Sequence, residues 1–119
     1  MVKRKDKFTI KDIYIEILLP DKDTNDSNNN SLVIYMKAFN STFLFTGDIE
    51  EKQEELLYYL EKEIIVDFLK IPHHGSVTSS SKYLLNCVKY NYAICMSGYK
   101  NTFGFPNNFV ISRYSKEKL

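Results

Sequence analysis

The stretch that decides the fold is TGDIEEKQEELLYYLEKEIIVDFLKIPHHGS, residues 46–76. Residues 41–46 lead into it; they are rich in β-branched and aromatic side chains and end at a glycine, which predicts a strand. Residues 49–62 have helical periodicity, and residues 64–71 form a short apolar run ended by a proline, which predicts a buried strand. The predicted helix has an apolar face and a polar face. The apolar face holds Ile49, Leu56, Leu57 and Leu60. The polar face holds Glu50, Glu51, Lys52 and Glu54.

Strand, helix and strand in this order form a βαβ unit, whose strands are parallel and whose crossover is almost always right-handed. The carboxyl ends of parallel strands lie at one edge of the sheet. Asp48 follows the first strand, and His73 and His74 follow the second. Neighbouring strands lie about 4.8 Å apart, and zinc binds carboxylate and imidazole at roughly 2.0–2.2 Å. Asp48 and the histidine pair are therefore candidate metal ligands.

The rest of the chain extends this α/β plan. Apolar runs predict strands at residues 13–19, 32–39 and 92–96, and residues 80–89 predict a helix. Pro106 suits the first turn of a final helix, with Phe109, Val110 and Tyr114 facing inward. The polar residues 21–30 are expected to form a loop, and the loop at 99–105 should reach the same sheet edge as Asp48.

The expected fold class is α/β, with three helices and a mixed sheet of about five strands. Residues 1–12 are expected to be a basic tail and lead-in, and residues 13–119 a single partial domain.

Bulk composition limits the function classes. The chain has 119 residues, of which 44% are hydrophobic, and this suits one small globular domain. Its net charge of +1, with acids and bases interspersed, is not the basic footprint that binds duplex nucleic acid. Apolar runs fall short of the roughly 20 residues that span a bilayer, and no signal-peptide pattern follows the basic N-terminus. We expect a cytoplasmic chain without direct membrane insertion, in which Cys87 and Cys95 are free and buried.

Asp48 also has a purely structural explanation. It precedes the predicted helix and is followed three residues later by Glu51, which is the spacing of a helix capping box. The carboxylate is therefore expected to cap the helix, to bind a metal, or to do both.

The residues after the second strand have alternatives as well. In extended backbone, His73 and His74 would point to opposite sides of the chain, so that one faces a metal while the other orients a substrate or a carboxylate. Ser76, together with Thr78 and Ser79, is expected either to cap the next helix or to donate hydrogen bonds to a bound phosphate.

Three blocks of sequence together resemble a known family. They are NNNSLV at residues 28–33, LFTGDIE at 44–50 and DFLKIPHHGS at 67–76. The blocks and their spacing resemble the C-terminal half of the metallo-β-lactamase-fold domain of the ComEC family, the membrane channel proteins for DNA uptake in competent bacteria. The resemblance implies half of an αββα sandwich hydrolase with a pair of zinc ions. It implies that Asp48 bridges both zinc ions, that His74 ligates one of them, and that His73 lines the pocket. The candidate catalytic residues are His73 and Ser76.

The chain also departs from that family. His73 and His74 are its only histidines, so the family motif His-x-His-x-Asp-His is not in this sequence, and Phe105 stands where the family has a further histidine. A catalytic zinc needs three protein ligands. The chain is therefore expected to be a fragment of a zinc-dependent hydrolase, inactive alone, for which the resemblance implies single-stranded DNA as substrate.

Two alternatives stand beside this expectation. One is a subunit that completes a split active site with a separate N-terminal half of the domain. The other is a metal-free structural or binding remnant. In each case the strands would fill only half of a two-sheet sandwich, which leaves one apolar sheet face uncovered.

Overall fold

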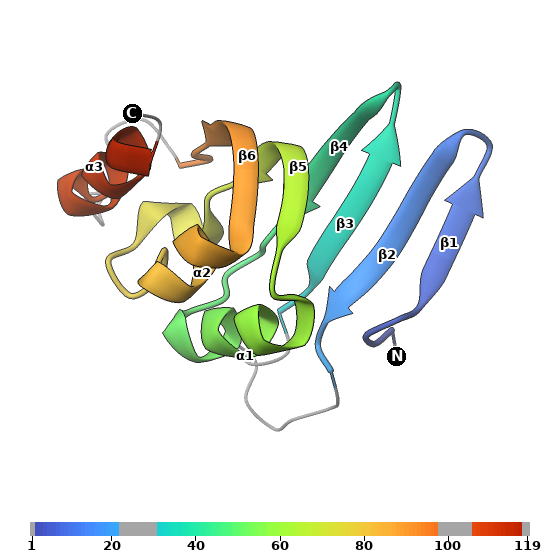
Figure 1. Ribbon diagram of the computed structural model, residues 1–119, viewed down its shortest axis with the longest axis horizontal. Helices are drawn as coiled ribbons and strands as arrows, with labels where there is room; N and C mark the ends of the chain where they lie inside the picture. Colours follow the sequence, from blue (N-terminus) through green and yellow to red (C-terminus); the bar gives the residue numbers. More distant parts are fainter. Residues whose placement is uncertain (1, 22–30, 98–105, 118–119) are drawn as a thin grey trace.

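The computed structural model of this chain describes residues 2–21, 31–97 and 106–117, with side chains up to Tyr114 in the last range. Most of the predicted loop at 21–30, all of the loop at 99–105 and Phe105 lie outside the described residues. Figure 1 shows the elements in chain order, from the β1 hairpin at the N-terminus to α3 at the C-terminus.

The strands form one six-stranded sheet in the order β1-β2-β3-β4-β5-β6. Neighbours are antiparallel from β1 to β4, whereas β4 with β5 and β5 with β6 are parallel. The strand bounds are Lys7–Ile10 (β1), Ile13–Leu19 (β2), Val33–Ala38 (β3), Ser41–Phe45 (β4), Ile64–Lys70 (β5) and Val88–Ile94 (β6).

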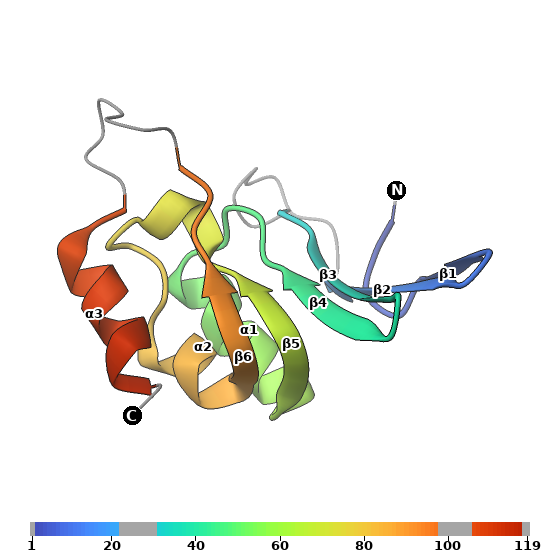
Figure 2. The same cartoon turned by 90° about the horizontal axis from the view of Figure 1, so that it is seen from above.

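Among the described residues, three α-helices and one short 3₁₀ turn accompany the sheet. They are α1 (Glu51–Glu61), the turn η2 (Pro72–Gly75), α2 (Lys82–Cys87) and α3 (Asn108–Glu117). Figure 2 shows all three α-helices gathered on one side of the sheet, around β5 and β6. In the part of the chain that the structure describes, no helix is long and apolar enough to cross a membrane.

The predicted α/β class and the βαβ unit are confirmed. β4 and β5 run parallel on either side of α1, with Leu44 paired to Leu69. Both leucines are fully buried against the helices, as is Leu57 of α1. This buried layer fixes the carboxyl ends of β4 and β5 at one edge of the sheet.

The sixth strand lies where only a basic tail and lead-in were expected. β1 pairs with β2 in antiparallel register, Phe8 opposite Ile15. Arg4 is also held, because its guanidinium donates to the Leu18 carbonyl and forms an ion pair with Glu61 of α1. Residues 7–10 are therefore a strand of the sheet, and Arg4 is attached to the folded domain.

The second half of the chain differs from the prediction in where its helix and strand begin and end. The predicted helix at 80–89 ends at Cys87, and the strand predicted at 92–96 begins at Val88 and ends at Ile94. Val88 pairs in parallel with Ile64, and Tyr90 pairs with Val66. Hydrogen bonding to β5 along the whole of β6 outweighs the helical pattern of residues 88–89.

Three side chains predicted from periodicity face the other way. Glu54 was expected on the exposed face of α1 but is fully buried, where its carboxylate accepts hydrogen bonds from the Ser80 and Ser81 amides at 2.6 and 2.7 Å. Leu56 was expected inside and is 40% exposed. In α3, Val110 and Tyr114 are buried as predicted, but Phe109 is 74% exposed.

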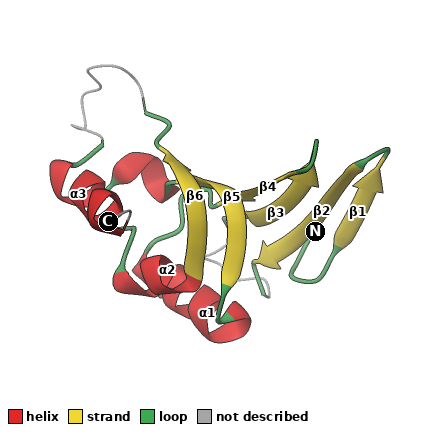
Figure 3. Cartoon of the chain, turned by 45° about the horizontal axis from the view of Figure 1, so that its top comes forward, coloured by secondary structure: helices red, strands yellow, loops and turns green. Residues whose placement is uncertain are grey.

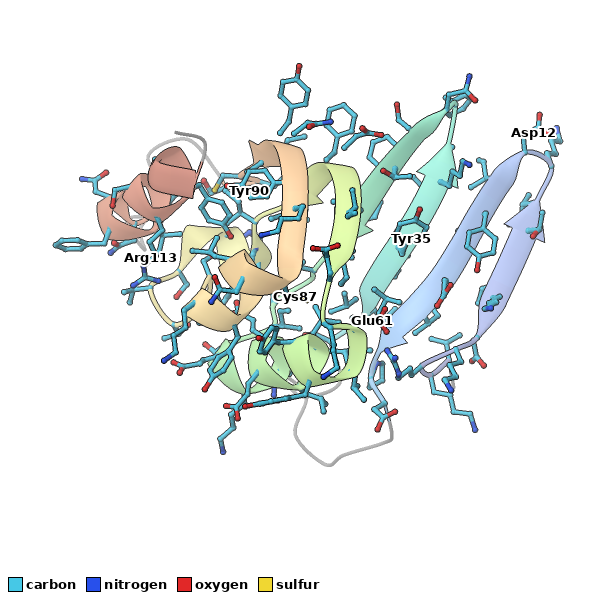
Figure 4. All side chains as sticks on the ribbon, viewed as in Figure 1. Asp12, Tyr35, Glu61, Cys87, Tyr90 and Arg113 are labelled. Atoms are coloured by element: carbon cyan, nitrogen blue, oxygen red, sulfur yellow. The ribbon has the colours of Figure 1, made fainter. Side chains whose placement is uncertain are left out.

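Polar contacts attach α3 to the body of the domain. Figure 4 shows Tyr90 and Arg113 on either side of the junction between β6 and α3. The Arg113 guanidinium donates to the Ser79 and Ser80 carbonyls at 3.2 and 3.1 Å, and the Tyr114 and Ser80 hydroxyls lie 2.6 Å apart. The segment between η2 and α2 is thus hydrogen-bonded to Glu54 of α1 on one side and to α3 on the other.

Candidate metal centre

Two loops at the carboxyl edge of the sheet build the candidate site. The loop after β4 carries Thr46, Gly47 and Asp48, and the loop after β5 begins with η2. The Thr46 hydroxyl donates to the Lys70 carbonyl, and the His73 amide donates to the Gly47 carbonyl at 3.0 Å. These two bonds hold the loops against each other, as the parallel βαβ unit predicts.

Asp48 and His74 meet across these loops. Asp48 Oδ1 lies 3.6 Å from His74 Nε2. The other ring nitrogen, His74 Nδ1, lies 2.8 Å from the Met96 carbonyl oxygen. Because a carbonyl oxygen can only accept, Nδ1 must carry a proton. In neutral His74 the lone pair of Nε2 therefore faces the Asp48 carboxylate.

Two facing acceptors repel unless a cation or a proton lies between them. A histidine whose one nitrogen donates to a backbone carbonyl while the other is directed at a carboxylate has the orientation that metal-ligating histidines adopt. The chemistry of this donor pair therefore fits a divalent metal ion such as zinc, which binds imidazole nitrogen and carboxylate oxygen.

His73 occupies a second cluster beside the first. Its Nδ1 lies 3.3 Å from Glu50 Oε2 and 3.4 Å from the Thr78 hydroxyl. Thr78 donates to the same Glu50 oxygen, and its hydroxyl lies 2.9 Å from that of Ser76. Ser76 is buried, with its hydroxyl directed at Thr78. Glu50 and Thr78 are therefore the groups that fix the His73 ring.

The backbone of the histidine pair differs from the extended conformation that was expected. His73 and His74 have φ of 50° and 56°, in the left-handed region. Their ring centroids are 6.4 Å apart, with an angle of 57° between the planes. The tight turn forced by Pro72 and Gly75 thus leaves one imidazole with Asp48 and the other with Glu50.

Asp48 does not cap α1, contrary to the capping-box explanation. The helix begins at Glu51, its N-cap is Glu50, and the Glu50 amide donates to Gln53 Oε1 at 3.1 Å. The capping box is formed by Glu50 and Gln53, two residues later than the pair Asp48 and Glu51 that the sequence predicted. The Asp48 carboxylate is thereby directed to His74 and not to the helix amides.

Sequence reasoning missed three participants. Glu50 was assigned to the exposed face of the helix, although the spacing Glu50–Gln53 also satisfies the capping-box pattern and would have placed it at the site. The Met96 carbonyl carries no sequence signal, because any residue supplies one. In addition, Lys70 Nζ lies 3.5 Å from the carbonyl oxygens of both Gly47 and Ile71, which puts a cation beside the Asp48 loop.

The two clusters do not form a complete metal site by themselves. Among residues 2–21, 31–97 and 106–117, no group of three acidic, histidine or cysteine side chains is arranged to hold a metal ion. A zinc centre that uses Asp48 and His74 therefore needs further ligands from elsewhere.

Comparison with known proteins gives the relatives of this chain. No family model matches it. It is 30% identical over 119 residues to ComE operon protein 3 of Bacillus subtilis, a match covering 99% of this chain and 15% of that protein. It is 38% identical over 103 residues to competence protein ComA of Neisseria gonorrhoeae, covering 85% and 15%. The chain is similar over most of its length to one segment of ComEC-family proteins. Recombination protein 2 of Haemophilus influenzae is a further ComEC-family relative, 36% identical over 107 residues.

The chain corresponds to one short segment of these relatives. It spans 13 to 15% of the length of ComE operon protein 3, recombination protein 2 and ComA. The ComEC resemblance predicted from the three sequence blocks is confirmed. The same three matches cover between 85 and 99% of this chain.

Proposed function

We propose that this ComEC-type segment contributes Asp48 and His74 to a zinc centre that acts on single-stranded DNA during DNA uptake. The observation that carries the proposal is the orientation of His74. Its Nδ1 is committed to the Met96 carbonyl, and its Nε2 lies 3.6 Å from Asp48 Oδ1. A cation between these two acceptors removes a repulsion that the fold otherwise maintains.

The remaining ligands come from a polypeptide segment outside the residues described. A hydrolytic zinc site uses three protein ligands and one open position, whereas Asp48 and His74 supply two. In such a site zinc supplies Lewis-acid polarisation of a phosphodiester oxygen and activation of water. Alone, the chain is expected to bind zinc weakly and to have no hydrolytic activity.

In this proposal His73 acts as a general acid or base at the edge of the site. Glu50 accepts from Thr78 and lies 3.3 Å from His73 Nδ1, an arrangement that orients the ring. His73 Nε2 would then be the atom that gives a proton to, or takes one from, a phosphodiester oxygen. Glu50 and Thr78 are positioning residues for this step, and Ser76 supports Thr78.

Two observations support single-stranded DNA as the proposed substrate: the names of the relatives and the position of Lys70. Competence and recombination are processes of DNA, and these are the words in the names of two relatives. Lys70 Nζ lies beside the Gly47 carbonyl, next to Asp48, where it would attract a phosphate. The near-neutral net charge suits a local contact with a single strand better than a broad duplex-binding face.

The test is hydrolysis of a labelled single-stranded oligonucleotide in the presence of zinc. The chain is assayed alone, and again after mixing with the segment of the Bacillus subtilis relative that precedes the matched region. We expect cleavage only in the mixture, and loss of that cleavage in Asp48→Asn but not in the surface variant Asp12→Asn. A mixture that forms a complex yet cleaves no faster than the segment alone would contradict the proposal.

A further inference from the structure

Two threonines, one near each end of β4, bridge that strand to β5 through their hydroxyl groups. β5 lies between β4 and β6 in the sheet (Figure 3). The backbone ladder described between β4 and β5 contains two residue pairs, of which the second is Leu44 with Leu69. Thr42 precedes these pairs, and Thr46 follows them. The two hydroxyl bridges therefore extend the contact between the strands beyond the ladder in both directions.

The bridge at Thr42 lies at the start of β4. The Asp67 amide donates to the Thr42 hydroxyl oxygen at 2.9 Å, and the Thr42 amide donates to Asp67 Oδ2 at 2.9 Å. The Thr42 hydroxyl also donates to that carboxylate oxygen at 3.2 Å, and Asn91 of β6 donates to Asp67 Oδ1 at 3.1 Å. This network joins β4, β5 and β6. Because Asp48 follows the opposite end of β4, the network lies away from the candidate metal ligands.

The bridge at Thr46 lies at the carboxyl edge of the sheet. Thr46 is fully buried, and its hydroxyl donates to the Lys70 carbonyl oxygen at 2.5 Å. Lys70 is the last residue of β5, so this bond ties the loop after β4 to the point where β5 ends. A buried hydroxyl without a hydrogen bond is costly. Burial therefore favours the arrangement in which Thr46 stays bonded to this carbonyl.

The contact between the two loops places the candidate ligands. Asp48 lies two residues after Thr46, and the Gly47 carbonyl between them accepts from the His73 amide at 3.0 Å. His74 is the next residue, and its Nε2 lies 3.6 Å from Asp48 Oδ1. The bond from His73 joins two main-chain groups, so it does not depend on the side chains at these positions. The Thr46 hydroxyl adds a buried side-chain bond to the same contact, and this bond does depend on the residue type.

We propose that Thr46 is a positioning residue for the zinc centre, because its hydroxyl holds the two loops at the separation that brings Asp48 and His74 together. Thr42 joins the same two strands but does not fix the loops. Thr46 is not itself a ligand and acts through Asp48 and His74. The inference rests on the proposed zinc centre for its functional meaning, whereas the contact between the loops is a property of the metal-free chain and is measured on it.

Hydrogen exchange of the His73 amide reports this contact, because the amide donates to the Gly47 carbonyl and exchanges when the loops separate locally. Thr46→Val keeps the shape of the side chain and removes the hydroxyl. It should speed exchange of the His73 amide about 10-fold, as expected for the loss of one buried hydrogen bond. Thr42→Val is the matched control, since it removes the hydroxyl that bridges the same strands. It should lower the urea midpoint but leave exchange at His73 unchanged.

A second pair of variants covers the case in which Thr46→Val does not fold. Thr46→Ser and Thr46→Ala lose the same methyl group and differ from each other only in the hydroxyl. Thr46→Ser should exchange the His73 amide as the wild type does, and Thr46→Ala should exchange it as fast as Thr46→Val. Circular dichroism checks that each variant is folded. The comparison of serine with alanine therefore separates the hydrogen bond from the packing of the side chain.

Titration of the same variants with Zn²⁺ connects the contact to the site. Zinc affinity should fall at least about 10-fold in Thr46→Val and Thr46→Ala, and it should be preserved in Thr46→Ser and Thr42→Val. A wild type that binds no zinc would refute the zinc centre, whereas the exchange rates, measured without metal, decide whether Thr46 fixes the loops. Unchanged exchange at His73 in Thr46→Val and Thr46→Ala, exchange in Thr46→Ser as fast as in Thr46→Ala, or equal acceleration in Thr42→Val would each overturn the proposal.

Discussion

His74 Nε2 lies 3.6 Å from Asp48 Oδ1, although the two residues belong to loops separated by the whole of α1 and β5. The parallel pairing of β4 and β5 brings the loops to one edge, and the bond from the His73 amide to the Gly47 carbonyl fixes their separation. The relationship is therefore a property of the βαβ unit.

Gly75 ends the histidine turn and is expected to tolerate no side chain. Its φ is +82°, and a Cβ there would lie 2.6 Å from Pro106 Cβ and 2.9 Å from Pro106 Cα. Gly75→Ala should lower the free energy of unfolding by about 2 kcal/mol or more, through strain and through displacement of the start of α3. Gly47→Ala, whose nearest contact would be 3.0 Å from the Leu32 carbonyl oxygen, should cost less. Urea denaturation of both variants checks this order, and a Gly75→Ala chain as stable as the wild type would refute it.

Glu54 is expected to make stability depend on pH. Burial raises the pKa of its carboxyl above the usual 4.5, against the hydrogen bonds from Ser81 and Ser80, which lower it. The folded state therefore holds the proton more tightly than the unfolded state. The resulting stability is fully present below about pH 4.5 and is lost as the pH rises through the folded pKa.

The test of Glu54 uses its neutral isostere. Glu54→Gln should remove this part of the pH dependence, measured as the urea midpoint across the acidic range. It should also lower the free energy of unfolding by about 1–3 kcal/mol, because one of the two amides at Ser80 and Ser81 would face an NH₂ group instead of an oxygen. Parallel pH profiles for the wild type and Glu54→Gln would show that the carboxyl does not titrate differently in the folded state.

The two free cysteines should differ sharply in reactivity. Burial, with smaller effects of Glu61 and Glu63, raises the pKa of the Cys87 thiol to about 11. Cys95 is half-buried, at the end of β6. Because the thiolate is the reactive form, a thiol reagent near pH 8 should label one cysteine of the folded chain and two after denaturation. Cys95→Ser should remove the fast reaction, and equal labelling of both thiols in the folded chain would be the contrary result.

Much of the fold and the edge location of the candidate residues could be predicted from the sequence. Strand patterns on either side of an amphipathic helix predict a parallel βαβ unit, and this places Asp48 and the histidines at one edge. Helical periodicity could not place Glu54, because two amides of a distant segment hold its carboxylate inside. The orientation of the histidine rings depends on left-handed backbone at two consecutive non-glycine residues, a conformation that is uncommon outside glycine.

Tertiary pairing also explains the remaining differences. Residues 88–89 continue a helical pattern, yet they pair with Ile64 and Ile65 along β5. The basic N-terminal segment forms β1 because its residues pair with β2, with Phe8 opposite Ile15 and Ile10 opposite Ile13. These strand pairings depend on residues that are distant in the sequence, and the local sequence pattern does not specify them.

The central claim is that Asp48 and His74 bind a metal ion together. Calorimetric titration of the folded chain with Zn²⁺ tests it most directly, with Asp48→Ala, His74→Ala and His73→Ala as variants and Asp12→Asn as the control on the distant β1–β2 hairpin (Figure 4). We predict weak binding of zinc that is lowered at least about 10-fold by Asp48→Ala and by His74→Ala, and little changed by His73→Ala or Asp12→Asn. Zinc affinity that is the same in the wild type, Asp48→Ala and His74→Ala would contradict the account.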